Sequence, residues 1–263
     1  MRGIILIVIF YFLIGFSTIY AQCGLENTSY KAGEVVEYEI FYNWGFIWLN
    51  AGWVRLEVKD SKYNGKDTYL FDTYGSSHES YDWLFKVRDH YYAHVDKETL
   101  LPVYFHRKNY EGGFELENKY IFNWDDNIIY SETENSKKPH SLDTVKIKPC
   151  TFDVLSAVYY LRNIDFSSMK MNETRTISSI LDNEVFELFI RYLGKETIED
   201  REGKKHECIK FSSLLIEGSI FKGGEDMYVW VTDDENKVPI LIEAKIVIGS
   251  AKAYLRHTEG LRN

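Results

Sequence analysis

Most of the chain alternates apolar and polar residues with a period of two, which is the pattern of strands that bury one face. Residues 35–42 are typical, because Val36, Tyr38, Ile40 and Tyr42 share one face and the residues between them share the other. Comparable runs predict further strands at residues 53–59, 69–74, 87–95, 101–109, 114–124, 127–133, 174–178, 185–194, 205–216, 227–232, 238–248 and 251–257.

Turn residues separate several of these runs. Asn64-Gly65 predicts a tight hairpin, since both residues tolerate the positive φ that such a turn needs. Residues 50–52 are expected to turn the chain after the aromatic stretch 44–49, which we interpret as one strand. Residues 135–141 are polar and contain a proline, so they are predicted to form a loop.

One stretch, residues 151–163, changes to a helical period. Its apolar residues and one arginine recur every three or four positions, at Phe152, Leu155, Val158, Tyr159 and Arg162. We expect Thr151 to cap this helix, Asp153 to suit its positive start, and Arg162 to be a surface charge at its end.

Two segments on either side of this helix resemble one another. Residues 91–105 and 228–242 each read as a strand, a turn that contains aspartate, and a return strand that opens with Pro102 or Pro239. One interpretation is an internal duplication; the other is two ordinary hairpins with the same turn chemistry.

The fold class that follows is all-β, mainly antiparallel, with one central helix. We expect one or two curved, incompletely closed sheets or half-barrels. The predicted division is a signal peptide at 1–21, an N-terminal β unit at 22–150, a connecting helix at 151–163 and a C-terminal β unit at 164–263. The length of the chain is compatible with one compact domain that contains both units.

The N-terminus has the features of a secretory signal. Arg2 precedes an apolar run at residues 4–16, and Ala21 is suited to cleavage before Gln22. The run is shorter than the ~20 residues of a membrane-spanning helix. An uncleaved anchor is one alternative. Lipid attachment at Cys23 is another, although Gln22 is larger than the residue that usually precedes a lipidated cysteine.

The chain has three cysteines, and their spacing matches no zinc site. Export would favour a disulfide. If one forms, we expect it between Cys23 and Cys150, because Cys208 lies in a strand-like run and is predicted to be a small buried residue.

Charge and motifs exclude several functions. The formal charge is −9 with no basic run, which argues against nucleic acid as a partner. We find no nucleophile elbow, phosphate-binding loop or paired-histidine metal motif. His90 and His94 would stand about 13 Å apart on a strand, too far for one ion. No catalytic residue, metal or cofactor is therefore predicted.

Aromatic residues supply the candidate ligand contacts. In the stretch 44–49 both faces are apolar, which indicates either a strand buried on both sides or a wall against an apolar ligand. The candidate ligand-binding residues are Trp44, Phe46, Trp48, Trp53 and Trp230.

The chain resembles the bacterial envelope proteins known as domain of unknown function 3108. The resemblance rests on Gly33-Glu34, Ala51-Gly52, Asp89, Asp96, Leu101-Pro102, residues 152–156 (FDVLS) and residues 230–239. It implies residence in the periplasm or at the outer membrane of a Gram-negative bacterium, and it implies no activity. A weaker similarity, in the hairpin that ends in leucine and proline, is to the periplasmic lipoprotein-carrier fold, a curved sheet around an apolar cavity.

Three hypotheses for function follow. The first is a non-enzymatic envelope protein that binds an apolar or amphipathic ligand such as a lipid. The second is a structural or interaction module that docks on another envelope protein, which predicts a continuous exposed apolar patch. The third is a hydrolase, which requires two convergent buried carboxylates.

Overall fold

The computed structural model describes residues 23–44, 47–215, 223–246 and 249–263, so the predicted leader at 1–21 lies outside the described residues. The strands are β1 (Val35–Trp44), β2 (Ile47–Tyr63), β3 (Lys66–Ser77), β4 (Val87–Asp96), β5 (Pro102–Glu111), β6 (Phe114–Asn123), β7 (Ile128–Asn135), β8 (Lys138–Lys146), β9 (Thr151–Phe152), β10 (Thr174–Leu181), β11 (Glu184–Glu199), β12 (Lys205–Leu215), β13 (Gly224–Thr232), β14 (Pro239–Lys245) and β15 (Ser250–Glu259). The helices are η2 (Glu79–Tyr81), α2 (Asp82–Phe85), α3 (Val154–Leu161) and η3 (Phe166–Ser168). None of the described helices is both long enough and apolar enough to cross a membrane.

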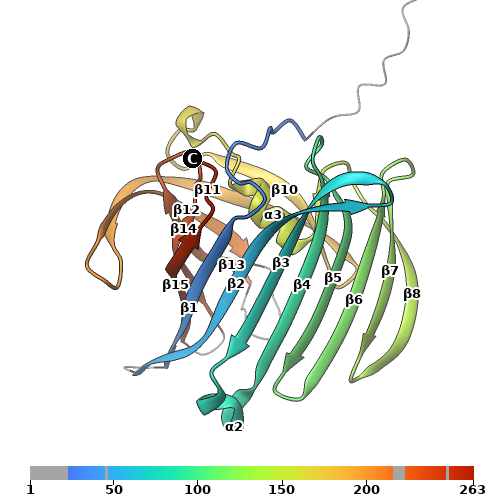
Figure 1. The fold of residues 1–263 in the computed structure, drawn as a ribbon, viewed down its shortest axis with the longest axis horizontal. Coiled ribbons are helices and arrows are strands. Elements are labelled where there is room, and N and C mark those ends of the chain that lie inside the picture. Colours follow the sequence, from blue (N-terminus) through green and yellow to red (C-terminus); the bar gives the residue numbers. More distant parts are fainter. Residues whose placement is uncertain (1–22, 45–46, 216–222, 247–248) are drawn as a thin grey trace, which may run out of the picture.

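All strands belong to one sheet, in the order β8-β7-β6-β5-β4-β3-β2-β1-β15-β14-β13-β12-β11-β10-β9. Neighbouring strands are antiparallel, except that β9 runs parallel to β10. The sheet is strongly curved, with α3 between its two arms (Figure 1). The predicted class, an all-β fold with a central helix and an incompletely closed sheet, is confirmed, because β8 and β9 remain edge strands.

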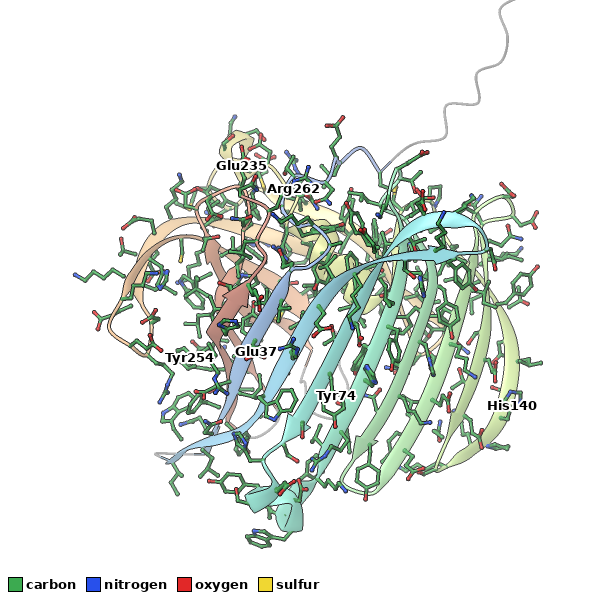
Figure 2. All side chains as sticks on the ribbon, in the orientation of Figure 1. Glu37, Tyr74, His140, Glu235, Tyr254 and Arg262 are labelled. Carbon is green, nitrogen blue, oxygen red and sulfur yellow. A yellow bond between two sulfur atoms is a disulfide. The ribbon has the colours of Figure 1, made fainter. Side chains whose placement is uncertain are left out.

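Alternation along the strands separates an inner face, which faces α3, from an outer face. On β1, Val36 and Tyr38 are buried on the inner face, whereas the carboxylate of Glu37 points outward and forms an ion pair with Arg55 of β2. Side chains directly opposite in register point to the same face, so each strand fixes the faces of its neighbours. Figure 2 labels Glu37, together with Tyr74 and Tyr254 of the same outer face.

The single strand expected over residues 44–49 is wrong. Trp44 ends β1 and lies opposite Ile47, which begins β2, so a hairpin connects them. Residues 50–52 do not turn the chain, because β2 continues through them with a bulge. A Cβ on Gly52 would lie 2.2 Å from the backbone oxygen of Ser76, so glycine is required for β3 to approach. Alternation persists on both sides of a hairpin, and periodicity alone therefore cannot locate this turn.

The loop predicted at residues 135–141 is also wrong. β7 and β8 form a hairpin in which Asn135 lies opposite Lys138 and Thr133 lies opposite Ser141. Pro139 is part of β8. The sheet tolerates this proline because β8 is an edge strand with one neighbour, so a missing N–H need not interrupt a ladder.

Helix α3 lies within the stretch where the sequence predicts a helix, but Asp153 caps it and Thr151 does not. The Asp153 carboxylate accepts hydrogen bonds at 2.9 Å from the backbone N–H groups of Leu155 and Ser156. Thr151 is instead an extended residue of β9 opposite Ser178. Burial raises the pKa of Asp153 to about 6, against the effect of its hydrogen bonds.

The main core lies between α3 and the inner face of the N-terminal strands. The Tyr159 ring of α3 stacks on Phe71 of β3 with ring centroids 3.8 Å apart, and Tyr30 meets both rings edge-on. Phe105 and Tyr120 extend this buried cluster along β5 and β6. Burial of each large apolar side chain contributes about 1.5–3 kcal/mol, so this contact fixes the position of the helix over the sheet.

A disulfide joins Cys23 to Cys150, the pair expected from the sequence, with Cα atoms 5.5 Å apart. It fastens the segment before β1 to the connection between β8 and β9. The loop that it closes spans 127 residues, and such a link stabilises by about 2–4 kcal/mol. Cys208 is a buried free thiol, and burial raises its pKa to about 12.

The turn between β10 and β11 reaches across to the opposite arm of the sheet. Asp182 forms an ion pair with Arg107 of β5. Asn183 accepts a hydrogen bond from Ser131 of β7 at 2.6 Å, and its backbone N–H donates to the Tyr120 hydroxyl at 3.1 Å. The two arms therefore touch although their edge strands are not paired with each other.

The two similar segments of the sequence form the hairpins β4–β5 and β13–β14. The return strand begins at Pro102 in the first and at Pro239 in the second. Strands from both sides of α3 belong to the same sheet. The division into two β units stays a prediction.

Candidate functional site on the inner face of the sheet

An apolar pocket of about 210 Å³ lies on the inner face where β1 pairs with β15. β1, β2, β14, β15 and α3 line it. Val158 of α3 is 43% exposed, although it belongs to the apolar stripe of the helix. The main contributors are Val36, Ile40, Val54, Leu56, Val158 and Ile242. The arrangement is a concave surface of branched side chains, suited to an apolar ligand.

A polar cluster beside this pocket is fully paired. We call it the closed cluster: Ser29, Glu34, Arg162, Asn163 and Asn236. The Arg162 guanidinium donates to both carboxylate oxygens of Glu34, at 2.5 and 3.0 Å, and to the backbone oxygens of Ser29 and Asn236. Arg162 is 5% exposed and Glu34 1%, so the expected surface charge is instead part of a buried ion pair. Burial and pairing of this kind position the end of α3.

A second polar cluster lies on the inner face of β3–β6. We call it the open cluster: Thr73, Asp89, Arg107, Asn109 and Asn118. The register places Asp89 opposite Asn109, and Arg107 opposite Asn118. Arg107 and Asn109 follow the buried Phe105 at alternate positions, so they share its face. All but Asp89 are at least nine-tenths buried.

An acidic pair occurs within this region. The carboxyl groups of Asp89 and Glu111 are neighbours, and burial together with the Glu111 charge raises the pKa of Asp89 to about 7. The Asn109 side-chain amide donates to the Tyr91 hydroxyl at 2.7 Å and to Glu111 at 3.4 Å. A convergent acidic pair is what the hydrolase hypothesis requires, and its chemistry stays a prediction.

Of the tryptophans named from the sequence, Trp48, Trp53 and Trp230 are not part of the lining of the inner pocket. Trp53 lies on the outer face, 5.6 Å from the Tyr74 ring. Trp230 is buried on that same face and donates to Glu196 at 3.0 Å. Trp48 is 46% exposed with the Lys252 ammonium over its ring. Phe46 lies outside the described residues, and Trp44 is described only as the end of β1.

The histidines considered as metal ligands have other partners. His90 contacts Asp72 at 2.7 Å and the Tyr92 hydroxyl at 2.7 Å, and His94 contacts Thr68 at 3.2 Å. In the part of the chain that the structure describes, no three His, Cys, Asp or Glu side chains are grouped as a metal site would require.

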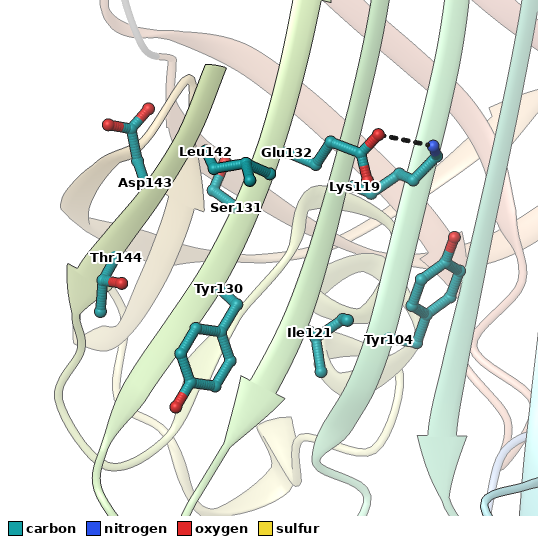
Figure 3. Close-up of a pocket in the computed structure, with 9 residues that line it drawn as sticks. All are labelled: Tyr104, Lys119, Ile121, Tyr130, Ser131, Glu132, Leu142, Asp143 and Thr144. Carbon is teal, nitrogen blue, oxygen red and sulfur yellow. Dashed lines mark hydrogen bonds and ion pairs between the residues drawn. The ribbon is translucent and has the colours of Figure 1, made fainter. Parts of the chain in front are cut away.

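A second hollow, of about 290 Å³, lies on the outer face of β5–β8 (Figure 3). An ion pair between Lys119 and Glu132, 3.2 Å apart, borders it (Figure 3). Ile121 and Leu142 leave 45% and 74% of their surfaces exposed. The lining of this hollow is less apolar than that of the inner pocket, because charged side chains lie on the same wall as the apolar ones.

Comparisons with known proteins show a family and a fold. Residues 37–256 match the family model described as Protein of unknown function (DUF3108). A solved structure similar to this chain is the beta-barrel-like protein of domain of unknown function DUF1849 from Brucella abortus. It is 9% identical with a TM-score of 0.56, and the match covers 90% of this chain and 99% of that one. The search of curated proteins found no match.

Proposed function

This chain belongs to the DUF3108 family of proteins of unknown function, and from that premise we propose that it binds an apolar or amphipathic ligand such as a lipid. The proposal includes a non-enzymatic role in a bacterial envelope, in the periplasm or at the outer membrane. The Cys23–Cys150 disulfide supports an oxidising compartment.

The observation that carries this proposal is the inner pocket. Val54, Leu56, Ile242 and Ala253 line it from the inner face of the sheet, and Val158 of α3 lines it while it stays 43% exposed. A ligand chain that covers these side chains would gain about 0.8 kcal/mol for each methylene removed from water.

Blocking the pocket tests the proposal. We expect Ala253→Trp to lower the affinity for decyl-chain amphiphiles at least tenfold, since the indole would occupy the space of the ligand chain. Isothermal titration with the purified chain, below the micelle concentration, measures this. Leu142→Trp, which fills the outer hollow instead, is the matched control and is expected to bind like the parent.

Two results would contradict the proposal. The first is native mass spectrometry that detects no lipid on protein purified from an envelope fraction. The second is a titration in which decyl amphiphiles give neither heat nor a shift in the unfolding temperature. If Leu142→Trp alone removed binding, the ligand would belong to the outer hollow.

A second candidate function, docking on another envelope protein, is favoured by an exposed apolar tip between β3 and β4. Trp83, Leu84 and Phe85 are 82%, 64% and 50% exposed. A Cβ on Gly112 would lie 2.3 Å from the Phe85 ring, so glycine at that position lets the tip rest on the β5–β6 turn. Three adjacent exposed side chains of this kind are typical of a contact surface.

Cross-linking in an envelope fraction distinguishes this candidate from lipid binding. A photoreactive residue at position 83 is expected to capture one protein partner, and Leu84→Ser to reduce the yield. The same probe at position 142, on the outer face, is the control. Equal labelling at both positions would exclude a specific docking tip.

A further inference from the structure

The open cluster leaves an unusual number of buried polar atoms unpaired. Among the described residues, six buried side-chain atoms lack a hydrogen-bond partner, and five of them belong to this cluster. The six atoms are Thr73 Oγ1, Asp89 Oδ1, Arg107 Nε, Asn109 Oδ1, Asn118 Oδ1 and Ser179 Oγ. Each such atom costs about 1–3 kcal/mol, and folded proteins pair nearly all of them. Their concentration on four neighbouring strands therefore indicates a buried polar site that is completed when a further group enters it.

The chemistry of these atoms defines what that group must offer. The amide nitrogens of Asn109 and Asn118 already donate, to Tyr91 and Thr133 respectively, so their free atoms are acceptor oxygens. Asp89 adds a carboxylate oxygen. One terminal nitrogen of Arg107 is paired with Asp182, whereas its Nε is a donor without a partner. The cluster thus presents mainly acceptors, with Glu111 as a further acid beside Asp89, and it suits a group that donates hydrogen bonds.

The open cluster begins two strands away from the wall of the apolar pocket, on the same face of the sheet. Val54, which lines the pocket, lies opposite Gly75, and Gly75 lies opposite Asp89. Adjacent strands are about 4.8 Å apart, so the pocket and Asp89 are separated by about 10 Å. A Cβ on Gly75 would meet only Val54 Cγ2 at 3.4 Å and the Trp53 backbone oxygen at 3.9 Å. No side chain of position 75 stands between the two surfaces, so one elongated molecule can contact both.

We propose that the open cluster binds the polar head of an amphipathic ligand, and that this head donates hydrogen bonds through hydroxyl or ammonium groups. The inference rests on the proposed function, because the apolar chain of the same ligand occupies the inner pocket. Asp89, Asn109 and Asn118 accept the hydrogen bonds of the head, and Thr73 accepts or donates one more.

Three amphiphiles that share one decyl chain test the proposal. Decylammonium and decyl glucoside donate hydrogen bonds, whereas decanoate only accepts them. Isothermal titration of the whole chain, below the micelle concentrations, is expected to give at least tenfold tighter binding for the two donors than for decanoate.

Variants then assign this preference to the cluster. In Asp89→Leu the ratio between the affinities for the two donor amphiphiles and for decanoate is expected to fall to about twofold or less, because an apolar side chain of similar size replaces the acceptor. Asn118→Leu is the second variant and is expected to reduce the preference for decyl glucoside. Asp72→Leu, on the outer face of β3, is the control and keeps it.

The outcomes separate the two proposals. Equal affinity for the three heads in the parent, or a preference that survives both cluster variants, would overturn the inference and leave the apolar pocket as the binding site. Absence of binding by all three amphiphiles would overturn the proposed function and the inference together. Two results together support both proposals. Ala253→Trp loses all binding, and only the parent and Asp72→Leu keep the preference for amphiphiles whose heads donate hydrogen bonds.

Discussion

The closed and open clusters are both polar groups buried on the inner side of one sheet, yet they differ in how completely they are paired. In the closed cluster the Arg162 guanidinium makes four hydrogen bonds that join the end of α3 to three other parts of the chain. In the open cluster Asn109 and Asn118 each keep a buried oxygen without a partner in the part of the chain described. Burial alone therefore does not distinguish a structural cluster from a binding surface; hydrogen-bond completeness does.

The largest effect is expected in the closed cluster. Glu34→Gln leaves the Arg162 charge buried beside a neutral partner, and the free energy of unfolding should fall by about 3–5 kcal/mol. Urea unfolding followed by circular dichroism measures it. Glu37→Gln is the matched control, because Glu37 pairs with Arg55 at the outer surface and should cost less than about 1 kcal/mol. Similar losses in the two variants would contradict the assignment of a closed cluster.

The same substitution in each cluster sharpens the comparison. The Asn163 side-chain oxygen accepts from the backbone N–H groups of Thr28 and Ser29, so Asn163→Leu should cost about 1–3 kcal/mol. Asn118→Leu removes the hydrogen bond from the amide nitrogen to Thr133, but it also removes an oxygen that has no partner, so it should cost less than Asn163→Leu, about 1 kcal/mol or below. Differential scanning calorimetry of both variants tests the difference, and a larger loss in Asn118→Leu would reverse it.

The smallest effect concerns pH and Asp89. Its pKa of about 7 in the folded chain lies above the ordinary value of 3.8, so the unfolded chain loses this proton first as pH rises. The shift from 3.8 to about 7 corresponds to about 4 kcal/mol. Because solvent screens the partly exposed Asp89, we expect its contribution to stability to fall by about 1–2 kcal/mol between about pH 4 and 8, and then to stay constant. Asp89→Asn removes this component and should be more stable than the parent at pH 8. If the free energies of unfolding of the two proteins changed in parallel with pH, the pKa of Asp89 would not be raised in the folded chain.

Much of the fold could be predicted because its cause is local. The two-residue alternation of Val36, Tyr38 and Ile40 places them on one buried face, and the helical spacing of Leu155 and Tyr159 holds whatever surrounds them. The misplaced turns have a local cause too. Alternation around Trp44 and Ile47 continues across a hairpin, so it does not locate the turn. Pro139 predicts a loop from the sequence, because only the strand order shows that β8 is an edge strand.

The sequence does not point to the inner pocket, and the role of the residues that it names as ligand contacts stays a prediction. The aromatic residues Trp48, Trp53 and Trp230 drew attention as ligand contacts, but the structure places Trp53 and Trp230 on the outer face and leaves all three out of the inner pocket. The open cluster was missed, although one signal was present. Arg107 and Asn109 are in phase with the buried Phe105, and polar side chains in the buried phase of a strand are exceptional.

The amino-acid sequence by itself determined the strands, the helix and the faces that each would bury, because these depend on periods of two and of three to four residues. Only the tertiary structure decided which strands are neighbours, that Arg162 meets Glu34, and that Asp89 lies beside the wall of an apolar pocket. These contacts join residues far apart in the chain, and their strength depends on burial and on the pairing of each polar atom, which no local pattern encodes.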